Sequence, residues 1–111
     1  MEPREQSEIE IAPGEVAARL ARGDVPFLID VREEWELTRG ILPGARSVPM
    51  SQFANRLDEL DVSQPIIVYC EHGVRSYDVA AYLVSRGYSA LSMSGGFAVW
   101  DGPVVPFAAA D

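Results

Sequence analysis

Two short, predominantly apolar segments most restrict the folds that this chain can adopt. Residues 25–31 read VPFLIDV and residues 66–70 read IIVYC, and both are rich in β-branched and aromatic side chains. Apolar runs of this length are typical of strands buried on both faces, as in a parallel sheet between two layers of helices. Parallel neighbours also need a crossover connection, usually a helix, so we predict an α/β fold.

The first half of the chain adds weaker signals around these runs. Residues 9–11 have the alternation of a short edge strand, and Pro13 and Gly23 are placed to begin and end a helix. Residues 33–37, EEWEL, predict a short helical turn. A Gly/Pro loop then leads to a brief strand at 46–48, which Pro49 ends.

The second half contains the clearest helix pattern, at residues 76–86, with Gly87 placed just after its end. A strand is expected at 88–93 and a helical turn at 97–100. Ser51 has the position of an N-cap. The helix that it would cap has apolar residues at i, i+4 and i+7, namely Phe53, Leu57 and Leu60.

Length and composition predict one domain. A chain of 111 residues, 48% of them hydrophobic, supports one modest core. We expect a flexible N-terminal segment at 1–8, the domain at 9–107 and a C-terminal tail at 108–111. The acidic start lacks the pattern of a signal peptide, and no stretch approaches the ~20 apolar residues of a membrane span. The expectation is a cytoplasmic protein with no membrane partner.

The net charge and the small number of cysteine and histidine residues exclude further classes of protein. Seventeen acidic and nine basic residues give a net charge of −8, which disfavours binding to nucleic acid. One cysteine cannot form an internal disulfide, and one cysteine with one histidine are too few for a closed zinc site. We therefore expect no metal and no cofactor.

The single cysteine, Cys70, stands where ligands bind in α/β sheets, at the carboxyl end of a predicted strand. The residues after it read EHGVRS. Gly73 permits backbone angles at which successive N–H groups converge, and the following helix adds its free first-turn N–H groups. Such a cradle favours an anion, either the thiolate of Cys70 or an oxyanion of a substrate.

Each residue of this stretch also has a plainer interpretation. Free cysteine is commonly a small buried hydrophobe. Gly73 can be a turn glycine, Arg75 a solvated first-turn residue and His72 a polar loop residue. Their combination favours a reactive thiolate, with the guanidinium of Arg75 suited to an oxyanion, although the charge of Glu71 opposes the thiolate.

Three longer motifs carry a resemblance to a known family. They are LIDVREEWELTRGILPGARSVP at 28–49, VYCEHGVRS at 68–76 and GGFAVW at 95–100. In this order they resemble a rhodanese homology domain over about residues 9–107. One departure is Ile41, which stands where many members have histidine.

The resemblance implies a rhodanese-like fold with a five-stranded, mostly parallel sheet covered by helices on both faces. It implies a sulfurtransferase that carries sulfane sulfur as a persulfide on Cys70, with thiosulfate as an example of the donor and a thiol or protein as the acceptor. We expect a monomer or weak homodimer. The binding loop would comprise Glu71, His72, Gly73, Val74, Arg75 and Ser76.

Two further residues lie at the same sheet edge. Asp30 and Arg32 follow the first apolar strand, where we expect a supporting role, most simply a structural ion pair or a cap for residues 33–37. Trp35 and Trp100 are interpreted as core or rim packing.

Other functions remain open. A cysteine phosphatase or arsenate reductase also cradles an oxyanion, but in a C-x5-R loop, whereas Cys70 to Arg75 is C-x4-R. A shorter ring of donors suits a persulfide better than a phosphate. A non-catalytic interaction or sulfur-carrier module with this fold is the other alternative, although loss of activity usually removes the nucleophile that is present here.

Overall fold

One five-stranded sheet organises the computed structural model, which describes residues 8–24 and 27–108. The strand order is β1-β5-β4-β2-β3, and every pair is parallel. The α/β fold with a parallel sheet is therefore confirmed. The bounds are β1 (Glu10–Ile11), β2 (Phe27–Asp30), β3 (Arg46–Ser47), β4 (Ile66–Tyr69) and β5 (Ala90–Met93).

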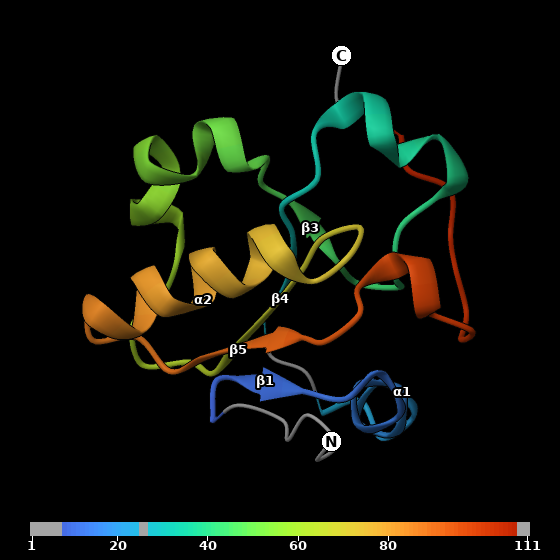
Figure 1. The fold of residues 1–111 in the computed structure, drawn as a ribbon, viewed down its shortest axis with the longest axis horizontal. Coiled ribbons are helices and arrows are strands. Elements are labelled where there is room, and N and C mark those ends of the chain that lie inside the picture. Colours follow the sequence, from blue (N-terminus) through green and yellow to red (C-terminus); the bar gives the residue numbers. More distant parts are fainter. Residues whose placement is uncertain (1–7, 25–26, 109–111) are drawn as a thin grey trace, which may run out of the picture.

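Helices cover both faces of this sheet, and Figure 1 shows α1 and α2 on different sides of it. Because side chains alternate along a strand, Ile29 and Val68 pack on the α2 side while Leu28 and Ile67 pack on the α1 side. The helices are α1 (Pro13–Ala21), α2 (Val74–Ser85) and the 3-10 helices η1 (Glu34–Arg39), η2 (Met50–Glu59) and η3 (Phe97–Val99).

The predicted helix ends are confirmed where proline and glycine marked them. Pro13 is the first residue of α1, and Gly23 follows its C-cap. At the end of α2, the Gly87 and Tyr88 N–H groups donate to the carbonyls of Val84 and Leu83. This pairing is a Schellman motif, which satisfies the last carbonyls of the helix.

The prediction that Ser51 is an N-cap is wrong. Pro49 occupies that position, and η2 begins at Met50. The Ser51 hydroxyl instead donates to Glu33 Oε1 at 2.8 Å. Glu33 already receives the N–H of Glu36 in a capping box of η1, so Ser51 links two 3-10 helices rather than starting one.

The strands β2 and β4 each end one residue before their apolar runs do, at Asp30 and at Tyr69. β2 spans Phe27–Asp30, while residues 25–26 of the predicted strand lie outside the described residues. The expected segments at 1–8 and 108–111 also fall largely outside them. In the described ranges, no helix is long and apolar enough to cross a membrane.

Candidate active site

The carboxyl ends of β2 and β4 bring the predicted site residues to one edge of the sheet. These strands are neighbours with Asp30 opposite Tyr69, and the Val31 N–H donates to the Tyr69 carbonyl at 3.0 Å. Arg32 and Cys70 therefore leave the sheet next to each other. The sequence had placed them 38 positions apart, and the parallel register joins them.

The cysteine loop, residues 70–76, surrounds its own sulfur with donors. The N–H groups of Gly73 and Ser76 donate to Cys70 Sγ at 3.2 and 3.3 Å, and Ser76 Oγ lies 3.4 Å from the same sulfur. Cys70 is only 1% exposed and belongs to the α2-side core. The side chain is thus buried, yet its sulfur meets polar hydrogens as well as hydrocarbon.

The last three residues of the cysteine loop are already helical, because α2 begins at Val74, two residues before the predicted start at residue 76. Gly73 is its N-cap with φ +88°, a left-handed conformation that glycine adopts readily. This bend turns the chain into the helix early enough for the Ser76 N–H, a free first-turn donor, to reach the sulfur. Ser76 is therefore inside the helix and does not initiate it.

A second turn packs directly against the cysteine loop. The Phe97 N–H donates to the Cys70 carbonyl at 2.8 Å, and the Ala98 N–H donates to the Glu71 carbonyl at 2.9 Å. A Cβ atom added at Gly96 would lie 2.5 Å from the Cys70 carbonyl oxygen. The motif GGFAVW thus holds the loop through its backbone, which requires a glycine at this close approach.

Arg75 forms a two-pronged ion pair with Glu36 of η1. Its Nη1 and Nη2 donate to Glu36 Oε1 and Oε2 at 2.6 and 2.7 Å. The hydrogen bonds and charge of Arg75 lower the pKa of Glu36, and those of Glu36 raise the pKa of Arg75. The guanidinium expected to receive a donor's oxyanion is therefore paired with a carboxylate of the protein.

Asp30 and Arg32 form a buried ion pair, in agreement with the simpler of their expected roles. Arg32 Nη2 donates to Asp30 Oδ2 at 2.8 Å and to the Gly40 carbonyl at 2.8 Å. Its guanidinium also stacks 4.1 Å above the Phe97 ring. Burial by itself lowers the pKa of Arg32, but the bonds and charge of Asp30 outweigh it, and the pKa is raised.

The remaining loop residues have different surroundings. The Glu71 carboxylate accepts from Arg39 at 2.8 Å and lies 3.4 Å from Arg32, so its charge is paired. His72 is exposed, and so is Val74. Glu71 joins the loop to η1, whereas the His72 and Val74 side chains are available to a molecule outside.

Two residues of this site did not emerge from the sequence patterns. Glu36 is one, and its signal was its place three residues after Glu33 in the capping box. The other is Ser92, whose hydroxyl lies 2.8 Å from Ser76 Oγ in the protein interior. Its signal was a polar residue inside the otherwise apolar strand ALSM.

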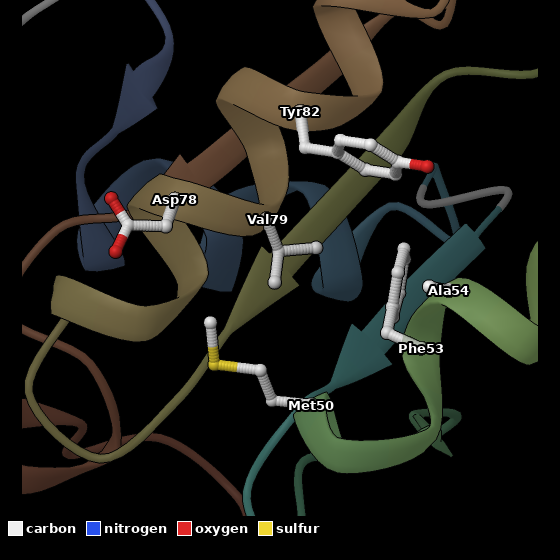
Figure 2. Close-up of a pocket in the computed structure, with 6 residues that line it drawn as sticks. All are labelled: Met50, Phe53, Ala54, Asp78, Val79 and Tyr82. Atoms are coloured by element: carbon white, nitrogen blue, oxygen red, sulfur yellow. The ribbon is translucent and has the colours of Figure 1, made fainter.

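An apolar groove lies between η2 and α2, as Figure 2 shows, with a volume of about 190 Å³. In Figure 2 the Asp78 carboxylate and the Tyr82 hydroxyl point away from the middle of this groove, which leaves its walls apolar. No residue of the cysteine loop lines it, so it is separate from the candidate site. Its lining consists of Met50, Phe53, Ala54, Asp78, Val79 and Tyr82.

The two tryptophans differ in their surroundings. Trp100 packs against the α1-side core, which agrees with its expected role. Trp35 is 77% exposed, so the expectation of core packing is wrong for it.

Within the residues that the structure describes, no three histidine, cysteine or acidic side chains gather as metal ligands would.

Comparison with protein families decides where this arrangement belongs. The model of the family described as "Rhodanese-like domain" matches residues 12–102. This chain belongs to that family. The three motifs that carried the resemblance all lie inside the matched range.

Curated members of the rhodanese-like family include named enzymes. A sulfurtransferase of Allochromatium vinosum is 34% identical over 92 residues, which are 82% of this chain and 86% of that protein. The thiosulfate sulfurtransferase GlpE of Pseudomonas putida is 34% identical over 95 residues, 85% of this chain and 86% of that protein. This chain is a rhodanese-like enzyme of the sulfurtransferase class.

Solved structures agree with the rhodanese fold. A rhodanese-like domain protein from Staphylococcus aureus superposes with a TM-score of 0.82 at 27% identity, covering 89% of this chain and 98% of the other. A rhodanese homolog from Thermus thermophilus gives a TM-score of 0.65 at 32% identity, covering 81% of this chain and 98% of the other.

Proposed function

We propose that this protein moves sulfane sulfur from a donor such as thiosulfate to a thiophilic acceptor through a persulfide on Cys70. The observation that carries the proposal is the convergence of two backbone N–H groups on Cys70 Sγ, at 3.2 and 3.3 Å. Donors aimed at one sulfur stabilise negative charge on it. They serve the thiolate that attacks and the thiolate that is regenerated.

The reaction has two steps. In the first, the Cys70 thiolate attacks the outer sulfur of thiosulfate, a new S–S bond forms, and the old S–S bond breaks with its electron pair leaving on sulfite. In the second, an acceptor such as cyanide attacks the terminal sulfur of the persulfide, which yields thiocyanate and regenerates the thiolate. Since the chain has a single cysteine, the acceptor comes from outside it.

Burial of Cys70 restricts the donor. The side chain is almost wholly covered, so an incoming molecule has to present a terminal, unhindered sulfur atom to reach Sγ. Thiosulfate and low-molecular-weight persulfides both do so. The exposed His72 and Val74 would then meet the rest of the donor or a thiol or protein acceptor.

The decisive experiment is cyanolysis with a cysteine variant. Purified protein with thiosulfate and cyanide is expected to form thiocyanate, and Cys70→Ser to form none, because the hydroxyl cannot take the place of the thiolate. Mass spectrometry of the wild type after thiosulfate alone should show the mass of one added sulfur, which a reductant removes.

A matched control for cyanolysis is Ser85→Ala, which removes an exposed hydroxyl at the far end of α2. It should retain the wild-type rate. No thiocyanate from the wild type with thiosulfate or with a low-molecular-weight persulfide would contradict the proposal and favour an interaction module. Hydrolysis of p-nitrophenyl phosphate at a comparable rate would favour a phosphatase.

A further inference from the structure

A chain of buried hydroxyl groups extends from the sulfur of Cys70 into the interior. Ser76 Oγ lies 3.4 Å from Cys70 Sγ, and Ser92 Oγ lies 2.8 Å from Ser76 Oγ. Both serines are fully buried. Ser76 belongs to α2 and Ser92 to β5, so the chain crosses from the helix to the sheet that it covers.

The position of Ser92 is one that an apolar side chain would ordinarily fill. Ser92 lies opposite Val68 in the parallel register, next to a strand whose four residues are all apolar and buried. Ala90, two residues before it, packs in the core under α2. A hydroxyl buried here costs free energy unless it is hydrogen-bonded, and Ser76 Oγ is its one side-chain partner in the described part of the chain.

Counting hydrogens gives the direction of this chain. If Cys70 is a thiol, three hydrogens, one on sulfur and two on the hydroxyls, share two contacts, and one hydrogen is left without an acceptor. If Cys70 is a thiolate, two hydrogens fill the two contacts: Ser92 donates to Ser76, and Ser76 donates to sulfur. The anionic form satisfies both hydroxyls, leaves no hydrogen without an acceptor and ends the chain on an acceptor.

The backbone contacts agree with that direction. The N–H groups of Gly73 and Ser76 already donate to the same sulfur. A thiol sulfur would donate to Ser76 Oγ, whereas a thiolate can only accept, so in the thiolate form the Ser76 hydroxyl hydrogen points to the sulfur. With no water competing in the interior, each bond of such a chain strengthens the next.

We propose that Ser92 is a positioning residue of the active site, whose hydroxyl donates to Ser76 Oγ, turns the Ser76 hydroxyl hydrogen toward Cys70 Sγ and thereby stabilises the thiolate. Ser92 acts through Ser76 and does not touch the sulfur. The inference rests on the proposed function, in which that thiolate is the nucleophile.

The test compares two variants of equal shape. Ser92→Thr keeps the hydroxyl and adds a methyl group, whereas Ser92→Val has a methyl group in place of that hydroxyl, and both are β-branched residues that suit a strand. The rate of Cys70 alkylation by iodoacetamide is measured against pH for each. This readout follows the thiolate directly and needs no sulfur donor.

We expect Ser92→Val to move the alkylation profile to higher pH. Its rate at neutral pH should be about two- to fivefold below that of Ser92→Thr, and the upper end of this range is the effect of losing one ordinary hydrogen bond. The rates should converge at high pH. Ser76→Ala, which removes the hydroxyl next to sulfur, should move the profile at least as far. Ser92→Ala serves as a smaller replacement if the valine variant does not fold.

Charged groups around the loop do not confound this comparison, because they are the same in both variants. A merely structural role of Ser92 would change the melting temperature and leave the profile in place. The charged and titratable groups of the elements that adjoin the cysteine loop include Asp30, Arg32, Glu36, Glu71, His72, Arg75 and Asp78.

The outcomes separate the inference from the proposed function. Coincident profiles of the threonine and valine variants would overturn the role of Ser92 even if the wild type makes thiocyanate. Separate profiles support it. A wild type that transfers no sulfur from thiosulfate or a persulfide refutes the proposed function, whatever the profiles show.

Discussion

At the scale of single residues, the neighbours of Cys70 matter more than its burial. A cysteine among hydrocarbon side chains alone would be a packing residue. Here the sulfur lies in the core on one side and accepts two N–H groups on the other. The loop thus excludes water from the sulfur while keeping the donors that an anion needs, and their strength rises in the low-dielectric interior.

Arg32 is the buried charge on which the site depends. Replacing it with leucine would leave the Asp30 carboxylate buried without its partner, and we expect a loss of about 3–5 kcal/mol in the free energy of unfolding. Denaturant unfolding measures it. Arg39→Leu is the control, since Arg39 is 63% exposed and its ion pair with Glu71 should contribute under about 1 kcal/mol. Equal losses would contradict this account of Arg32.

The pairing of Arg75 with Glu36 makes opposite predictions for the two residues. We propose that Arg75 helps to bind the oxyanion end of the donor, so Arg75→Ala should raise KM for thiosulfate about tenfold, the loss of one charged hydrogen bond. Glu36→Gln removes the competing carboxylate charge and should lower that KM. Steady-state cyanolysis measures both. An unchanged KM in Arg75→Ala would remove its proposed role.

At the scale of elements, the site is a junction of backbones. The N–H groups of Phe97 and Ala98 bond the cysteine loop, and Gly95 and Gly96 allow this close approach. η1 reaches the loop through Glu36 and through the ion pair of Arg39 with Glu71. Where two backbones are in direct contact, a glycine tolerates few substitutions, because there is no space between the backbones for a side chain. This explains why two glycines far along the chain belong to the same site as Cys70.

Gly96→Ala should damage that junction. The backbone has φ +67° there, and an added Cβ would lie 2.5 to 2.6 Å from atoms of Cys70 and Glu71. Strain alone costs about 1–3 kcal/mol, and displacement of the loop should also lower cyanolysis activity. Gly14→Ala is the control: nothing lies within 4 Å of its added Cβ in α1, so it should stabilise by about 0.5–1 kcal/mol. Thermal unfolding compares them, and equal effects would contradict the prediction.

At the scale of the whole molecule, net charge opposes the proposed test substrate. A charge of −8 repels a dianion such as thiosulfate during its approach. The cations Arg32 and Arg75 at the site are already paired with carboxylates. The protein is therefore better matched to a donor with less negative charge, and a low-molecular-weight or protein persulfide is the candidate.

Added salt should consequently raise kcat/KM for thiosulfate, by up to about tenfold, because screening weakens the repulsion. Cyanolysis at increasing sodium chloride measures this, and choline chloride at matched ionic strength excludes an effect of the sodium ion. A fall in kcat/KM with salt would show that local cations, and not the overall field, control donor binding.

Much of the architecture follows from local chemistry. The two apolar runs became the central strands β2 and β4, and Pro13, Gly23 and Gly87 marked helix ends because their backbone preferences act locally. The N-cap prediction for Ser51 failed for a nonlocal reason, since its hydroxyl donates to Glu33, 18 residues earlier in the chain. No spacing rule pairs Arg75 with Glu36 or Ser76 with Ser92, which lie 39 and 16 residues apart.

By itself, the sequence determined the alternation of strands and helices, the edge at which Cys70 stands and the glycine that bends the loop after it. These depend on burial patterns and backbone preferences, which are properties of short segments. Only the tertiary structure decided what each polar group contacts. Hydrogen bonds and ion pairs act over about 3 Å, and only the packing of η1 and β5 around α2 brings Glu36 to Arg75 and Ser92 to Ser76.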